Sequence, residues 1–155
     1  MTNAMAHSRG RRNPADGRAP ARRASASVGV VFLVVGVLGF LPGVTSNFHE
    51  LYWAGHESTA KLFGTFQVSV LHNLVHLAFG VAGLAMSRTV SGSRTFLVGG
   101  GAIYLVLWLY GLVINRGTAA NFIPVNLADN WLHFGLGIAM IALGLLTVRD
   151  PLPAN

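Results

Sequence analysis

The sequence contains no cysteine and little charge. Without a thiol, neither a disulfide nor a thiolate metal site can form. Only 10% of the 155 residues are charged, against about a quarter in an ordinary soluble domain, and 52% are apolar. A water-soluble helical bundle needs charged outer faces. The composition therefore favours a protein that lies in a lipid bilayer.

The few charged residues leave four long windows without Asp, Glu, Lys or Arg. Each window has about the 20 residues that a helix needs to cross the hydrocarbon core, where a helix satisfies its own backbone hydrogen bonds. We therefore predict an all-α fold, a polytopic membrane four-helix bundle. The predicted domain covers residues 24–148, with spans at about 24–43, 62–87, 95–115 and 130–148. Residues 1–23 are predicted to form a disordered basic tail and residues 149–155 a second tail.

Basic residues are distributed unequally around these spans. Nine of the eleven lie beside one set of span ends, and only Lys61 and Arg116 lie beside the opposite ends. The positive-inside rule then predicts a multi-pass protein of the cell membrane with both termini in the cytoplasm. A signal peptide cleaved after Ser46 is the alternative explanation of the first span.

The partners expected from the composition are membrane lipids. Six arginines in the first 23 residues predict attraction to anionic lipid headgroups, at about 1 kcal/mol per basic residue near the surface. Nucleic acid is not expected as a partner, because this charge lies directly before a span. Association into a homo-oligomer stays open.

Two segments of the chain are repeated. The letters NLVH at 73–76 match NWLH at 130–133, an offset of 57 positions, and a glycine follows four positions after each. Before each copy comes the pair Asn-Phe, at 47–48 and at 121–122, an offset of 74. These matches predict two duplicated transmembrane hairpins, related by an axis along the membrane normal.

Long blocks of the chain also resemble a known family. They read GVLGFLPGVTSN at 36–47, FQVSVLHNLVHLAFGVAGLA at 66–85 and NFIPVNLADNWLHFGLGIAMIALG at 121–144. The stretch 30–146 resembles a family of small four-helix integral membrane proteins widespread in actinobacteria, catalogued only as a domain of unknown function. The resemblance implies the fold and the membrane location, and it implies no activity.

Polar residues on the inward stripes of the predicted helices are the candidates for a site. Glycines on the same stripes are expected to serve helix packing. An ionisable residue within a span is costly, which raises a functional hypothesis for the histidines. The candidate ligand-binding or interhelical polar cluster consists of His72, Asn73, His76, Tyr104, Trp108, Asn130 and His133.

Two interpretations of this cluster stay open. In the first, neutral imidazoles exchange hydrogen bonds with the asparagines, Tyr104 or Trp108 and form a clasp worth about 0.6 to 2 kcal/mol per bond. In the second, the three histidines hold a metal or haem, form a proton relay, or line a pocket for a quinone-like ligand that Tyr104 and Trp108 contact.

No enzyme motif is present. The sequence has neither a Gly-rich phosphate loop nor a His-Glu-x-x-His pattern, and its five acidic residues are predicted to lie in tails or loops, which leaves no buried carboxylate for acid–base catalysis. We expect a non-enzymatic structural or regulatory membrane component without a cofactor or a metal site. Binding of a haem, metal or quinone-like ligand, or a proton relay, is the alternative.

Local structure is predicted for the outer loops. Residues 56–66 are expected to form a helical lead-in to the second span, and Asp129 is expected to be the N-cap of the last helix. Cation binding by the outer loop is the alternative for four of its residues, but they have no recognised metal-ligand spacing and are expected to be solvated: His49, Glu50, His56 and Glu57.

Overall fold

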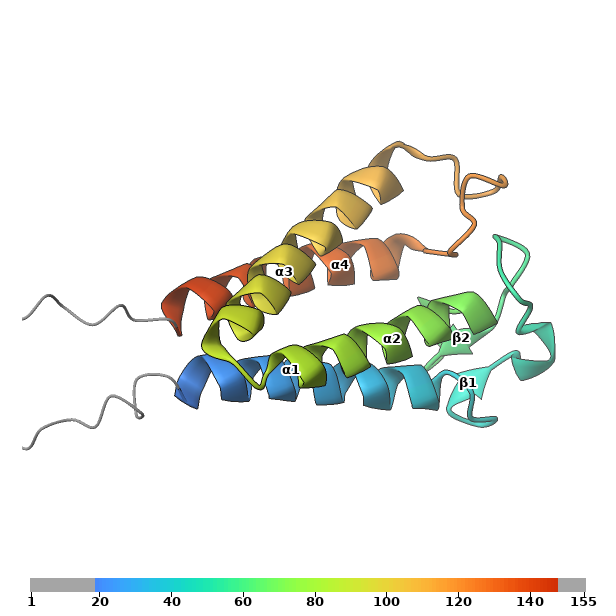
Figure 1. The fold of residues 1–155 in the computed structure, drawn as a ribbon. Coiled ribbons are helices and arrows are strands. Elements are labelled where there is room, and N and C mark those ends of the chain that lie inside the picture. The colour runs from blue at the N-terminus through green and yellow to red at the C-terminus, as the bar shows by residue number, and fades with distance from the viewer. Residues whose placement is uncertain (1–18, 148–155) are drawn as a thin grey trace, which may run out of the picture.

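The computed structural model of the chain describes residues 19–147, which contain four α-helices. Figure 1 shows them arranged as two hairpins. Helix α1 packs along α2, and α3 packs along α4. The all-α membrane bundle predicted from the sequence is therefore confirmed. The helices are α1 (Ala19–Leu38), α2 (Val70–Met86), α3 (Val90–Val113) and α4 (Leu127–Leu146).

Three of the helices, α1, α3 and α4, are long and apolar enough to cross a membrane. Helix α2 is also apolar but has only 17 residues, so the predicted span of 62–87 is too long at its start. The other helix bounds shift by a few residues. Residues 19–23, predicted in the tail, form the first turn of α1; residues 1–18 and 148–155, which include the predicted tail of 149–155, lie outside the described part of the chain.

The segment before α2 is wrongly predicted as helix. It forms two short strands, β2 (Lys61–Leu62) and β3 (Phe66–Gln67), which pair antiparallel, and β1 (Thr45–Ser46) pairs with β2. Phe63 and Gly64 in the connecting turn have φ values of 53° and 68°, which a right-handed helix does not allow. Burial of Leu62 and Val68 then holds this small sheet against the end of the first hairpin.

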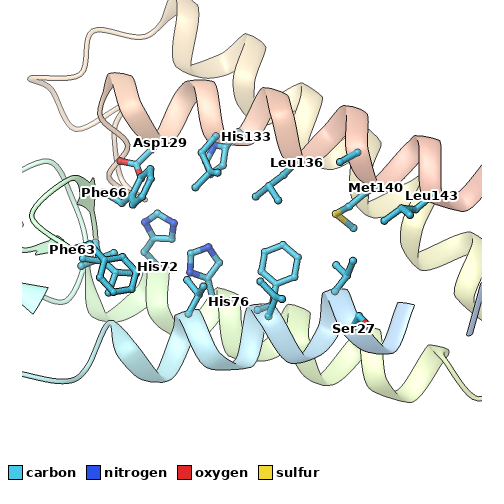
Figure 2. A pocket seen from close by; sticks show the side chains of 18 residues that line it. Ser27, Phe63, Phe66, His72, His76, Asp129, His133, Leu136, Met140 and Leu143 are labelled. Atoms are coloured by element: carbon cyan, nitrogen blue, oxygen red, sulfur yellow. The ribbon is translucent and has the colours of Figure 1, made fainter. Parts of the chain in front are cut away.

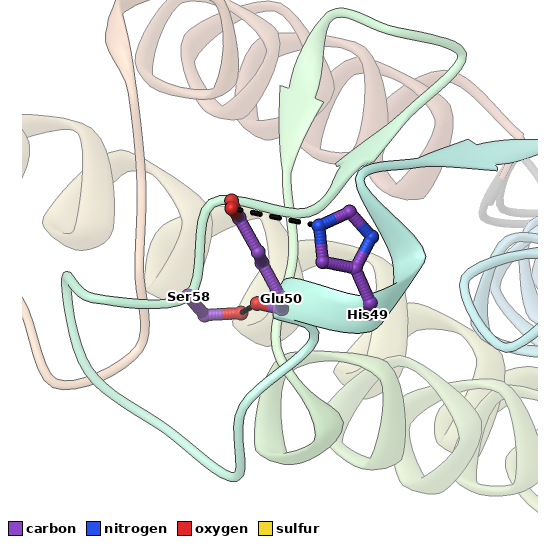
Figure 3. Close-up of polar contacts among 3 residues, drawn as sticks. All are labelled: His49, Glu50 and Ser58. Carbon is purple, nitrogen blue, oxygen red and sulfur yellow. Dashed lines mark hydrogen bonds and ion pairs between the residues drawn. The ribbon is translucent and has the colours of Figure 1, made fainter.

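The outer loop between α1 and α2 is held together by a buried hydroxyl. Ser58 Oγ donates a hydrogen bond to the carbonyl oxygen of Val68 at 2.7 Å and accepts one from the backbone N–H of Tyr52 at 3.2 Å. It also lies 3.3 Å from the carbonyl oxygen of Glu50, while the side chain of Glu50 points away toward His49 (Figure 3). The His49–Glu50 pair is 3.6 Å apart and the histidine side chain is 81% exposed, as expected for solvated residues.

The two hairpins are built alike, as the predicted duplication requires. Gly29 of α1 lies on the backbone of α2 at Gly80, and Gly101 of α3 lies on the backbone of α4 at Gly137. A Cβ added at Gly29 would lie 2.9 Å from the carbonyl oxygen of Gly80, and one added at Gly101 would lie 2.7 Å from that of Gly137. Such close approach is how helices associate where lipid supplies no hydrophobic drive. Helices α2 and α4 correspond at an offset of 57, and α1 and α3 at an offset of 72.

The paired loop residues do not share a structure. Asn47 is exposed and has a left-handed backbone with φ 51°. Asn121 is buried, and its side-chain oxygen accepts a hydrogen bond from the backbone N–H of Val125 at 2.9 Å. The Asn-Phe pairs at an offset of 74 therefore match in sequence but not in structure, because the two outer loops fold differently. The helices do not share this offset.

Candidate functional site

A cavity of about 350 Å³ lies between α1 and α4. Figure 2 shows side chains from both helices facing this space, with α2 contributing histidines at the end near the small sheet. We call this the loop end of the cavity. The other end, near the turn between α2 and α3, is bordered by Ser27, Met140 and Leu143. Most of the lining is aliphatic or aromatic; the polar side chains at the loop end and in the middle are His72, His76, Asp129 and His133.

The structure brings the three predicted histidines together. The ring centroids of His72 and His76 are 4.6 Å apart, and those of His72 and His133 are 6.5 Å apart. The three residues are 4%, 9% and 6% exposed. Two come from the first hairpin and one from the second, so the cluster lies where the hairpins meet (Figure 2).

The imidazoles do not form the hydrogen-bonded clasp that the first interpretation requires. Among the described residues, the Nδ1 atom of each histidine is buried without a hydrogen-bond partner. A buried polar atom without a partner costs about 1 to 3 kcal/mol. An unpaired group in a native structure calls for a functional explanation, such as a ligand. Asn73, Trp108, Arg116 and Asn130 also carry such atoms away from the cavity, so the case for the second interpretation rests on the three imidazoles that border one cavity.

Asn73 and Asn130 serve the helix contacts within the hairpins. The side chain of Asn73 lies directly on Gly39, the residue after α1, and that of Asn130 lies directly on Gly111 of α3. Both asparagines are fully buried, and neither lines the cavity. They occupy equivalent positions in the two repeats, so the matching asparagines of the sequence reflect the duplicated packing.

Tyr104 and Trp108 lie in different surroundings, although the sequence places both on one stripe of α3. The ring of Tyr104 contacts His133 at 5.1 Å and Phe32 at 5.5 Å, behind the cavity lining. Trp108 instead packs on Phe134 of α4, with ring centroids 4.7 Å apart, and does not line the cavity. Neither Tyr104 nor Trp108 is among the residues that line the cavity. The tryptophan belongs to the interface inside the second hairpin.

Asp129 borders the cavity, although the sequence predicts it only as a helix N-cap. It is 3% exposed and borders the loop end of the cavity (Figure 2), so the prediction that every carboxylate lies in a tail or loop is wrong. Its Oδ2 atom accepts hydrogen bonds from the backbone N–H groups of Gln67 and Asn126, at 2.9 Å and 2.8 Å. Asn126, not Asp129, is the N-cap of α4, in a capping box. The signal was available: at the offset of 57, Asp129 corresponds to His72.

A size difference between the repeats explains why the cavity is found on one side. Phe79 of α2 fills the space toward α3, where its ring contacts Phe96 at 5.4 Å and Tyr104 at 5.6 Å. The equivalent position of α4 holds Leu136, which faces α1 and lines the cavity. The smaller side chain leaves the corresponding space between α1 and α4 unfilled.

The donor set does not fit a metal ion. Within residues 19–147, no group of three His, Asp or Glu side chains is arranged to hold one. One oxygen of Asp129, the nearest carboxylate, already accepts two backbone hydrogen bonds. The arrangement suits an organic molecule that forms hydrogen bonds with imidazoles and packs against aliphatic side chains.

Comparison with known proteins places the chain in a family but adds no activity. No curated protein and no solved structure matches it. The family described as a domain of unknown function (DUF4383) matches residues 22–146, which is nearly the whole of the helical bundle. The chain therefore belongs to the DUF4383 family, whose function is unknown.

Proposed function

We propose that this chain is a non-enzymatic, multi-pass protein of the cell membrane that binds a lipid-soluble ligand in the cavity between α1 and α4. The observation that carries the proposal is that three buried imidazoles, those of His72, His76 and His133, border one largely apolar cavity. Pockets for small organic molecules have this character, with an apolar lining and a few convergent polar groups.

The rim of the cavity supports access from the bilayer. Val31 of α1 is 56% exposed and Leu132 of α4 is 42% exposed, and both side chains line the cavity. Exposed aliphatic residues on membrane-spanning helices face lipid tails. A ligand dissolved in the bilayer can thus reach the histidines between α1 and α4 without crossing water.

The proposed role is binding, because the groups at the cavity lack the partners that catalysis needs. No imidazole here has a hydrogen-bonded carboxylate to orient it, and no hydroxyl or amine nucleophile lies at the loop end among the described lining residues. General acid–base and nucleophilic catalysis both depend on such positioned pairs.

The proposed orientation places the start of α1 in the cytoplasm. Of the lysines and arginines among residues 19–147, only Lys61 and Arg116 lie at the loop end of the bundle. The other four, all arginines, lie at the opposite end. Arg22 is held there by a hydrogen bond from its Nε to the carbonyl oxygen of Ser87 at 3.0 Å. This distribution follows the positive-inside rule and favours contact with anionic headgroups. The four arginines are Arg22, Arg23, Arg88 and Arg94.

Mass spectrometry of organic extracts tests the proposal. The full chain is purified in detergent from its native membrane, and the extract is compared with that of a Leu136→Phe variant. The larger side chain fills the space that Phe79 fills in the other repeat, so a stoichiometric ligand present in the natural protein should be lost. Leu145→Phe, on the same helix at an exposed position outside the cavity, is the control. An extract identical for all three proteins would contradict the proposal.

A further inference from the structure

The polar groups of the cavity also indicate the chemistry of the ligand's head. Among the described residues that line the cavity, none is Lys or Arg, and the one acidic group is Asp129. An anionic head, such as a phosphate or a fatty-acid carboxylate, would lie near a carboxyl group with no cation opposite it. Burying an unpaired charge is strongly unfavourable. The charges therefore select an uncharged head.

The imidazoles decide which uncharged head fits. A neutral imidazole has one N–H donor and one acceptor nitrogen. His76 of α2 and His133 of α4 occupy equivalent positions in the two repeats, so they approach the cavity from opposite hairpins. A para-quinone carries two carbonyl oxygens on opposite edges of its ring. Two donors at equivalent positions of the two hairpins match those two acceptors.

The remaining lining accommodates a flat ring and a long tail. Phe66 and Phe63 border the loop end, and Phe32 packs on His76 with ring centroids 5.7 Å apart. Toward the other end the lining is mostly aliphatic, with Leu136, Met140 and Leu143. A cavity of about 350 Å³ holds a ring and the start of a chain, and the opening between α1 and α4 leaves room for the rest of the chain in the bilayer.

From these observations, and resting on the proposed function, we infer that the cavity binds the head group of a quinone with a long apolar tail. The ring lies at the loop end, His76 and His133 donate hydrogen bonds to its two carbonyl oxygens, and the tail follows α4 past Leu136 and Leu143. The binding involves no covalent or redox step.

Binding measurements with three lipids test this head-group chemistry. The full chain, stripped of lipid in detergent, is titrated with phylloquinone, with squalene, which has an isoprenoid chain without carbonyl groups, and with oleate, which has an anionic head. Bound lipid is quantified by mass spectrometry after size-exclusion chromatography. We expect about one phylloquinone per chain, with squalene and oleate bound at least tenfold more weakly.

Variants separate the head from the tail. His76→Leu and His133→Leu should each weaken phylloquinone binding about three- to tenfold, the effect of one lost hydrogen bond, and leave squalene binding unchanged. His49→Leu, at the exposed loop histidine, should change neither. Unchanged melting temperatures and unchanged squalene binding exclude misfolding as the cause of a loss.

The outcomes distinguish the inference from the proposal beneath it. Two results would overturn the quinone assignment alone, provided that Leu136→Phe still abolishes binding. In the first, squalene or oleate binds as tightly as phylloquinone. In the second, the histidine variants bind phylloquinone normally. If none of the three lipids binds, or if Leu136→Phe binds phylloquinone as the natural chain does, both the assignment and the proposed cavity function are wrong.

Discussion

Asp129 Oδ2 accepts a hydrogen bond from the backbone N–H of Gln67 at 2.9 Å, across 62 positions of the chain. This bond joins β3, in the outer loop of the first hairpin, to the first turn of α4 in the second. A second bond supports it, from the side-chain amide of Asn126 to the carbonyl oxygen of Thr65 at 2.6 Å. The hairpins are thus tied together at the loop end, beside the cavity that they enclose.

Removing this carboxyl group should destabilise the bundle. Asp129→Ala leaves the N–H groups of Gln67 and Asn126 without their acceptor and breaks the capping box, so we expect a loss of about 2 to 3 kcal/mol in the free energy of unfolding. Asp129→Asn keeps an acceptor oxygen and should cost less. Thermal denaturation in detergent measures both, with Glu57→Ala at an exposed loop position as control. Equal melting temperatures for Asp129→Ala and the natural chain would show that the tie contributes nothing.

Glycine-to-alanine substitutions should affect stability differently at helix contacts and at positions that face lipid. In Gly101→Ala the new Cβ would lie 2.7 Å from the carbonyl oxygen of Gly137, so α3 and α4 must separate, at a cost of about 1 to 3 kcal/mol. Gly99→Ala, two residues earlier, meets nothing within 4 Å and should be neutral or slightly stabilising, because alanine favours the helix. The comparison is again by thermal denaturation. A similar loss for both variants would contradict the close packing at Gly101.

Protein purified from its native membrane should show no Soret band and no stoichiometric metal. The expectation follows from the donor arrangement, because no three His, Asp or Glu side chains in residues 19–147 are placed around one ion. Absorption spectra of the oxidised and reduced protein, together with elemental analysis, test it. A Soret band that disappears in His133→Ala would instead assign the histidines to haem.

The orientation can be tested by labelling single cysteines, since the natural sequence has none. Thr118→Cys lies in the exposed loop between α3 and α4, and Ser91→Cys lies at the exposed start of α3. A membrane-impermeant maleimide should label the first in intact cells and the second only after permeabilisation. The reverse pattern would invert the proposed topology.

The sequence by itself determined the features that depend on local patterns. Charge-free windows set the membrane helices, because a helix in lipid needs only its own length of apolar residues. The repeated Asn and His positions revealed the duplication, and the helical period placed His72, His76 and His133 on inward stripes. The spans and the stripes follow from neighbours within one helix, and the duplication follows from comparing two segments letter by letter.

Only the tertiary structure decided the features that depend on segments far apart in the chain. Because of the turn at Phe63 and Gly64, the segment expected to be helical forms a small sheet that packs on the first hairpin. Asp129 reads as an ordinary helix start until the loop before α2 covers it. The cavity depends on Leu136 standing where the other repeat has Phe79, which matters only once α1 and α4 face each other. Packing between distant segments, unlike hydropathy, has no local signature in the sequence.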